Sequence, residues 1–199
     1  MRVARVRAGA VPIAPGEPRG LLLDTSGRLL VRDESMGIVS ATYTAATSFV
    51  PAASATDAII LTGSATKIVR LKRIILCGSV AATPASSTVS VIRRTTAASG
   101  GTAVAATISK NVAASAAATA IVSHYTANPT PGTNGGVLRS SLVSWVVQGG
   151  LLDRVTFEFG NEWAEPATLV GTGEAFAIQL GAPTLNLCTH TLEWTEATA

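Results

Sequence analysis

Short runs of β-branched and apolar residues, separated by turn residues, follow one another along most of this chain and restrict its fold more than any other feature. In residues 67–77 (KIVRLKRIILC) a period of two places Arg70 and Lys72 on one side. The same period places Arg73 on the other side, with Leu71. Such runs predict about ten strands, at residues 38–50, 58–62, 67–77, 88–94, 118–125, 136–145, 154–159, 167–171, 175–180 and 185–195.

Glycine, proline and asparagine lie between these runs, as tight turns require. Because no long amphipathic helix is predicted, the pattern favours an all-β fold, an antiparallel β-sandwich of jelly-roll type, over residues 37–199. Residues 111–120 (NVAASAAATA) are the exception, since their alanines favour helix. A short helix or a single helical turn stays an alternative there.

The first 36 residues differ in kind from the rest. Pro12, Pro15 and Pro18 exclude a helix of useful length and a central strand. Residues 1–36 are therefore expected to form an extended N-terminal arm. Within it, the turn sequence Asp-Thr-Ser-Gly at residues 24–27 separates two leucine-rich runs, which predicts a small hairpin.

Two short strands alone are marginal in water, so the hairpin is expected to pack on another surface. That surface belongs either to the sandwich of the same chain or to a neighbouring chain. The arm residues expected to contact a partner are Arg2, Arg5, Arg7, Leu22, Leu23, Leu29 and Leu30.

Composition narrows the class of protein. With 47% hydrophobic and 14% charged residues, the bulk of the chain is too apolar to be disordered. Proline, glycine, serine and threonine interrupt every long uncharged stretch, so no membrane-spanning helix is predicted. Pro12 and Pro15 break what would be the apolar core of a secretory signal, and a cytoplasmic site of synthesis is the default expectation.

Charge is distributed unevenly along the chain. Residues 1–110 hold thirteen Lys or Arg and five Asp or Glu, or +8, whereas residues 111–199 hold two and seven, or −5, which together give the net charge of +3. This segregation favours docking to an acidic protein surface, or packing between copies, over nucleic-acid binding. An ordinary solvated charge pattern is the simpler alternative.

The residues that could carry catalysis do not form a convincing set. Cys188 and His190 fall on one face of the last predicted strand, but such positions stand about 7 Å apart, beyond hydrogen-bond contact. They supply at most two ligands, too few for a zinc site. His124 is expected to be an exposed or interface strand residue. Cys77 and Cys188 belong to no CxxC pair and are expected to be free thiols.

The carboxylates give no more specific signal. Glycoside hydrolysis needs two acidic groups across a sugar, but Glu158 lies in an alternating strand where an outward-facing polar residue is the simpler interpretation. Trp163 and Trp194 are expected to fill the core or seal its ends. The sequence therefore predicts no enzyme, no cofactor and no metal site, and a small-molecule ligand is not expected.

The basic strand Arg70, Lys72 and Arg73 is the remaining candidate. Phosphate binding is conceivable for such a strand together with Arg93 and Arg94 of a later strand, but no aromatic residue accompanies them for stacking on bases. These three residues are therefore expected to contact acidic groups of a partner protein or of a neighbouring copy, with no nucleic acid and no membrane involved.

Beyond residue 40 the chain resembles a family of tailed-bacteriophage virion proteins. The resemblance rests on Tyr43, residues 49–57 (FVPAASATD), 62–74 (TGSATKIVRLKRI), 116–120, 125–130 (YTANPT), 159–161 and 193–196 (EWTE), which come in the expected order. It implies a non-enzymatic component of the particle. Jelly-roll-like members of this family decorate and cement the head or form parts of the tail.

This resemblance implies a capsid decoration protein, made in the host cytoplasm and located in the virion, that binds across major capsid protein subunits. A compact domain and an arm suit such a role, because many weak contacts give avidity in a symmetric assembly. A homotrimer is expected. A tail, baseplate or short-fibre protein, with a structural or receptor-binding role, is the main alternative. A secreted carbohydrate-binding module and a cryptic hydrolase are weaker ones.

Overall fold

The computed structural model describes residues 22–23, 29–30, 40–52, 54–147, 154–160, 166–182 and 185–198. The chain divides into two units, Met1–Val39 and Ser40–Ala199. In the first unit β1 (Leu22–Leu23) and β2 (Leu29–Leu30) pair antiparallel, which is the pairing that a hairpin requires. The rest of the expected arm lies outside the described residues.

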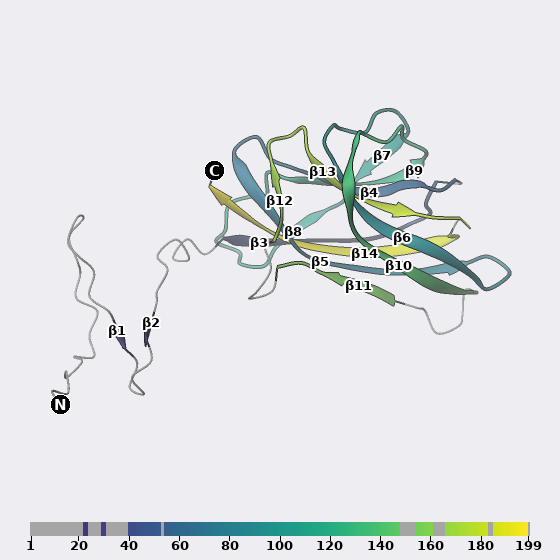
Figure 1. Ribbon diagram of the computed structural model, residues 1–199, viewed down its shortest axis with the longest axis horizontal. Helices are drawn as coiled ribbons and strands as arrows, with labels where there is room; N and C mark the ends of the chain where they lie inside the picture. Colours follow the sequence, from purple (N-terminus) through teal and green to yellow (C-terminus); the bar gives the residue numbers. More distant parts are fainter. Residues whose placement is uncertain are drawn as a thin grey trace. The chain divides into compact units, whose positions relative to one another are not determined.

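The described part of the second unit consists of β-strands and their connections. The strands are β3 (Ala41–Phe49), β4 (Thr56–Thr62), β5 (Lys67–Val80), β6 (Ala85–Arg94), β7 (Thr102–Ala105), β8 (Ile108–Lys110), β9 (Ile121–Ala127), β10 (Asn134–Val147), β11 (Arg154–Glu158), β12 (Ala167–Val170), β13 (Ala175–Leu180) and β14 (Leu187–Thr198). Figure 1 shows them in chain order.

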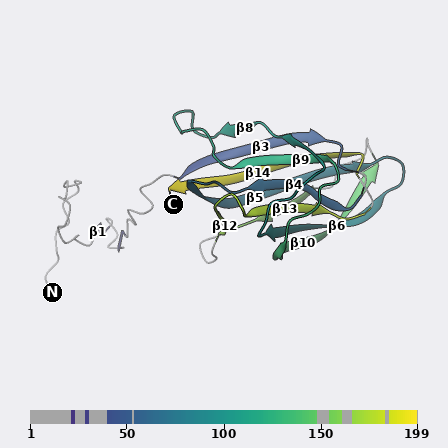
Figure 2. The ribbon, with the colours of Figure 1, turned by 90° about the horizontal axis from the view of Figure 1, so that it is seen from above.

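These strands form two antiparallel groups. Sheet I has the order β8-β3-β14-β5, and β11 and β12 pair one after the other with the free side of β5. Sheet II has the order β7-β9-β4-β13-β6-β10. The end of β10 joins them, because Val146 and Val147 pair in parallel with Ser79 and Val80. Figure 2 shows the strands from a second direction.

The core lies between the two sheets, as alternation along the strands requires. On β14 the buried residues Cys188, His190, Leu192 and Trp194 alternate with half-buried polar ones. Trp145 fills the core from the opposite sheet, and both tryptophans are fully buried. Trp163 lies outside the described residues. The prediction of an all-β antiparallel sandwich is therefore confirmed.

Two elements differ from the sequence-based prediction. Strands β7 and β8 were not predicted. They carry the chain from the edge of sheet II to the edge of sheet I, and Ala106 N donates a hydrogen bond to Val122 O at the crossing. Residues 111–120 form no helix; one hydrogen bond from Ser115 N to Val112 O closes a single turn there.

Candidate functional site

The residues expected to contact a partner fall into two groups. Arg2, Arg5 and Arg7 lie outside the described residues. The four leucines of the arm are placed only by the backbone pairing of β1 with β2, in which Leu22 lies opposite Leu30 and Leu23 opposite Leu29. Arg70, Lys72 and Arg73 lie on β5 of the sandwich and are fully described.

A β-bulge places this basic strand differently from the prediction. Arg73 pairs with Glu193 of β14, but the next pair joins Leu71 to Trp194, so Lys72 is an extra residue in β5. The extra residue reverses the alternation, and Arg73 is exposed while Leu71 is buried. The prediction that Arg73 shares the side of Leu71 is therefore wrong.

The bulge leaves the three basic side chains with different surroundings. Arg73 Nη2 donates to Glu193 Oε2 at 2.9 Å, and Glu158 of β11 lies opposite Arg73 on the other side. Its charge is largely neutralised. Neither Arg70 nor Lys72 forms an ion pair with another described residue. These two, together with Lys67 at the start of β5, carry the available positive charge of the strand.

Threonine and serine dominate the outer face of sheet I around this strand. Thr195 and Thr168 lie on the two strands that flank Arg70. Farther along, Ser48 and Thr189 of neighbouring strands share a hydrogen bond of 2.7 Å between their hydroxyl oxygens. The side chains around the basic strand are therefore short, and the longer side chains of Arg70 and Lys72 extend beyond them.

Glu196, which the sequence did not single out, holds a connecting segment onto the sandwich. Its carboxylate accepts hydrogen bonds from the backbone N–H of Thr119 and of Ala120 at 3.0–3.1 Å and from Trp194 Nε1 at 3.1 Å. The hydroxyl of Thr119 lies 2.7 Å from the same carboxylate and 2.7 Å from Ser64 Oγ. Because Thr119 and Ala120 bind this carboxylate, β9 begins at Ile121 and not at residue 118.

The electrostatics of Glu196 follow from these bonds. Burial raises the pKa of its carboxyl group, but the hydrogen bonds from Ala120, Thr119 and Trp194 outweigh burial and hold the pKa below its ordinary value. Tyr43 stacks on Trp194 at a centroid distance of 5.9 Å and donates its hydroxyl hydrogen to Ala116 O. Residues 116–120 are thus fixed by tertiary contacts and do not follow their helix propensity.

Glu196→Gln should lower the free energy of unfolding by about 1–2 kcal/mol. The carboxylate accepts hydrogen bonds with two charged oxygens, whereas the glutamine amide has one neutral acceptor oxygen and an NH2 group that faces other donors. Urea denaturation measures the change, and the amides of Thr119 and Ala120 should exchange faster with solvent. Glu158→Gln, at an exposed position, is the matched control and should stay within about 0.5 kcal/mol of wild type. Equal stability of the two variants would contradict this role of Glu196.

A buried ion pair ties three strands of sheet II together. Asp57 on β4 accepts two hydrogen bonds from the guanidinium of Arg94 on β6, at 2.6 and 2.9 Å, and β13 lies between these strands. The side chain of Asp57 is 0% exposed and that of Arg94 is 6% exposed. Burial, and then the negative charge of Asp57, raise the pKa of Tyr125 on β9.

Two histidines face each other across the core. His124 of β9 and His190 of β14 have ring centroids 6.1 Å apart, and Phe49 packs against both. The expectation that His124 is exposed or at an interface is wrong for the isolated chain, because pairing of β9 with β4 turns it inward, where it is 7% exposed. Both ring nitrogens of His190 and Nδ1 of His124 lack a hydrogen-bond partner among the described residues.

Burial shifts the pKa values of the two histidines and of Cys188. It lowers the pKa of His190 to about 4, with a smaller contribution from His124, and it lowers the pKa of His124 as well. Burial, then Cys77, raises the pKa of the Cys188 thiol to about 12, so this thiol stays protonated and unreactive. Both cysteines are free. Cys188 and His190 are therefore core residues and do not form a nucleophile–base pair.

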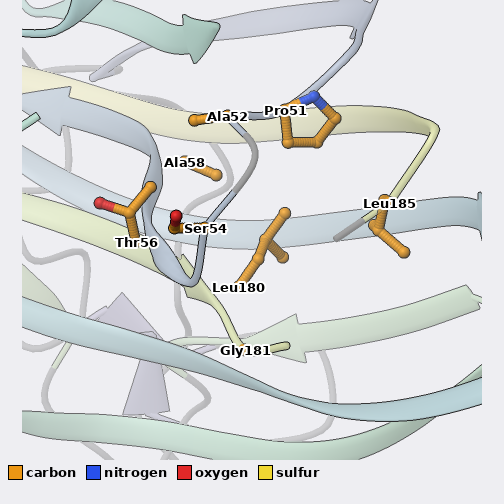
Figure 3. Close-up of a pocket in the computed structure, with 8 residues that line it drawn as sticks. All are labelled: Pro51, Ala52, Ser54, Thr56, Ala58, Leu180, Gly181 and Leu185. Atoms are coloured by element: carbon orange, nitrogen blue, oxygen red, sulfur yellow. The ribbon is translucent and has the colours of Figure 1, made fainter. Parts of the chain in front are cut away.

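A small cavity lies between the end of β13 and the segment before β4. Figure 3 shows its lining, which consists of Pro51, Ala52, Ser54, Thr56, Ala58, Leu180, Gly181 and Leu185. Its volume of about 10 Å³ is the space of one water molecule. An organic substrate does not fit there.

The described part of the chain offers neither a metal site nor a membrane-spanning helix. That part contains no cluster of three or more His, Cys, Asp or Glu side chains placed to hold a metal ion. Nor does it contain a helix long and apolar enough to cross a membrane.

Comparisons with known proteins found no relative of this chain. No protein-family model matches the chain, and no curated protein and no solved structure matches it at a significant level. The resemblance to tailed-bacteriophage virion proteins thus gains no support from these comparisons.

Proposed function

We propose that this chain is a non-enzymatic structural protein of a tailed-bacteriophage virion, and that it decorates and cements the capsid. In this role it is made in the host cytoplasm, forms a homotrimer and binds across subunits of the major capsid protein. Its arm and its basic strand make the contacts. The resemblance to such virion proteins, which rests on short phrases spread over residues 41–199, suggests the class of protein.

The observation that carries the proposal is that the buried ionisable groups of the described domain serve its internal packing. Asp57 and Arg94 bind each other, Glu196 binds backbone amides and the indole of Trp194, and the two core histidines pack on Phe49. These groups stiffen a compact sandwich. A stiff domain suits a protein that acts by covering surface on other subunits.

Two basic side chains of β5 support binding through the arm and the basic strand: Lys72 is exposed and Arg70 is half-buried. Arg70 and Lys72 stand on a Thr/Ser-rich face where acidic groups of a partner can approach them. Arg2, Arg5 and Arg7 extend the basic character into the arm. Several weak contacts of this kind, repeated over a symmetric shell, add up to stable attachment.

Removing residues 1–35 should abolish attachment to capsids while the remaining domain stays folded. Capsids of the encoding phage, purified without the decoration protein, are mixed with full-length or truncated chain and sedimented. Full-length protein should co-sediment, and the truncated form should stay in the supernatant with an unchanged β-type circular dichroism spectrum. Co-sedimentation of the folded, truncated form would show that the sandwich makes the main contact and would overturn the role of the arm.

A tail, baseplate or short-fibre protein with a structural or receptor-binding role is the alternative, because the same sandwich serves there. Antibody labelling of intact virions in the electron microscope separates the two locations. Label over the head supports the decoration role. Label restricted to the tail would replace it with the alternative.

A further inference from the structure

Strand β10 has a long free edge. From Asn134 to Trp145 it pairs with β6 on one side, and it meets β5 only at Val146 and Val147. Among the described residues no strand pairs with the other side of residues 134–145. The register shifts of β10 lie before Arg139, so residues 139–145 form a regular strand whose outer edge pairs with no other described strand. Within this strand, Leu142 O accepts a long hydrogen bond of 3.4 Å from Ser141 Oγ.

The other edge strands of the described sheets are short or charged. β7, β8, β11 and β12 have four, three, five and four residues. Arg154 and Glu158 are exposed on β11, and β8 ends in Lys110. Short length and charge are how proteins prevent unwanted strand pairing at an edge. Residues 140–145 of β10 (SSLVSW) carry no charge.

An exposed leucine stands in the middle of this free edge. Leu142 is 72% exposed, more than any other large apolar side chain of the described residues. Ser140 and Ser144 flank it on the same face and form hydrogen bonds with Ser90 and Ser86 of β6, at 3.0 and 3.2 Å. The face around Leu142 is therefore lined by small side chains.

The pattern around Leu142 is complementary to itself. If two β10 strands pair antiparallel about this residue, Leu142 lies opposite Leu142 of the second copy, and Ser140 lies opposite Ser144 of the second copy. The only charge of the segment, Arg139, then stands at opposite ends of the pair, and it is held over the ring of Phe159 at 5.4 Å. A two-fold interface requires this kind of self-complementarity.

We infer that β10 binds β10 of a second copy of this chain, antiparallel and centred on Leu142, so that sheet II continues across a two-fold axis. Backbone hydrogen bonds along residues 139–145 supply the association, and the two leucines cover each other. The contact is smaller than a standard interface of about 1,600 Å², so it is a weak one that forms at tens of micromolar protein. It does not rest on the proposed function.

Leu142→Lys tests this contact, because it places two ammonium groups opposite each other while an exposed side chain leaves the fold unchanged. At protein concentrations well above tens of micromolar, sedimentation equilibrium should give the wild-type chain about twice the mass of the variant. Val170→Lys, at a valine of β12 that is 59% exposed, is the matched control and should keep the wild-type mass. Equal masses for wild type and Leu142→Lys would overturn the inference.

Disulfide trapping tests the register directly. Residues opposite each other in an antiparallel pair have Cα atoms about 4.5–5.5 Å apart, within the range that a disulfide spans. With Cys77→Ser as background, Leu142→Cys should form a covalent dimer under mild oxidation, at least ten times faster than Val170→Cys. Equal rates for the two cysteine variants would exclude β10 pairing about Leu142, whatever the mass of the wild-type chain.

Discussion

Asp57→Ala should lower the free energy of unfolding by about 3–5 kcal/mol, because it leaves the guanidinium of Arg94 buried without a counter-charge. Asp57 is 0% exposed and its carboxylate receives both hydrogen bonds of the Arg94 fork. Urea denaturation followed by tryptophan fluorescence measures the loss, since Trp145 and Trp194 are buried in the same domain.

An exposed ion pair provides the matched control. Arg73 and Glu193 lie 2.9 Å apart with side chains 45% and 25% exposed. Water screens such a pair, so Glu193→Ala should cost at most about 1 kcal/mol. A cost for Asp57→Ala no larger than for Glu193→Ala would contradict the buried-charge argument.

The double variant Asp57→Ala/Arg94→Met separates the effect of the unpaired charge from the effect of the lost side-chain volume. Methionine removes the stranded charge and keeps much of the volume of the arginine side chain. The double variant should therefore regain most of the stability that Asp57→Ala loses. A double variant less stable than Asp57→Ala would mean that Arg94 stabilises sheet II by contacts other than its ion pair.

Stability should fall by about 3 kcal/mol between neutral pH and about pH 4 on account of His190 alone. Burial lowers its pKa from 6.5 to about 4, so the unfolded chain takes up a proton in this interval while the folded chain does not. The contribution is fully present above pH 6.5 and is lost as the pH falls toward 4. His124, whose pKa is also lowered, acts in the same direction.

His190→Leu isolates this effect, because leucine fills a similar space without an unpaired ring nitrogen. Unfolding free energies of wild type and variant are compared at about pH 7.5 and about pH 5. The fall in stability between these pH values should be clearly smaller for the variant. Glu196 does not obscure the result, because its stabilising contribution is lost only as the pH falls from 4.5 toward its lowered folded pKa, below the interval compared. The same pH dependence in both proteins would contradict the assignment.

Much of the fold could be predicted from local sequence. Period-two alternation located ten of the twelve strands of the sandwich domain, and β13 has the predicted bounds of residues 175–180. Strands β7 and β8 were not predicted because Thr102–Ala105 and Ile108–Lys110 are too short to show a period. The helix alternative for residues 111–120 failed because Glu196 and Tyr43 hold that segment from distant strands.

The candidate site was less predictable, since its contacts join residues far apart in sequence. Arg70, Lys72 and Arg73 were recognised as a basic strand, but the bulge at Lys72 is visible only in the register between β5 and β14. Glu196 and Thr119 are 77 positions apart, and Asp57 and Arg94 are 37 apart. No local pattern marks such partners.

By itself, the sequence determined that this chain folds into an antiparallel sandwich, because alternation and turn residues act over a few neighbouring positions. Only the tertiary structure decided which charges are buried in pairs, which remain free on the surface, and which strand edge stays open. Those outcomes depend on how strands align across the sheets, and a one-residue shift of register changes the side to which a side chain points.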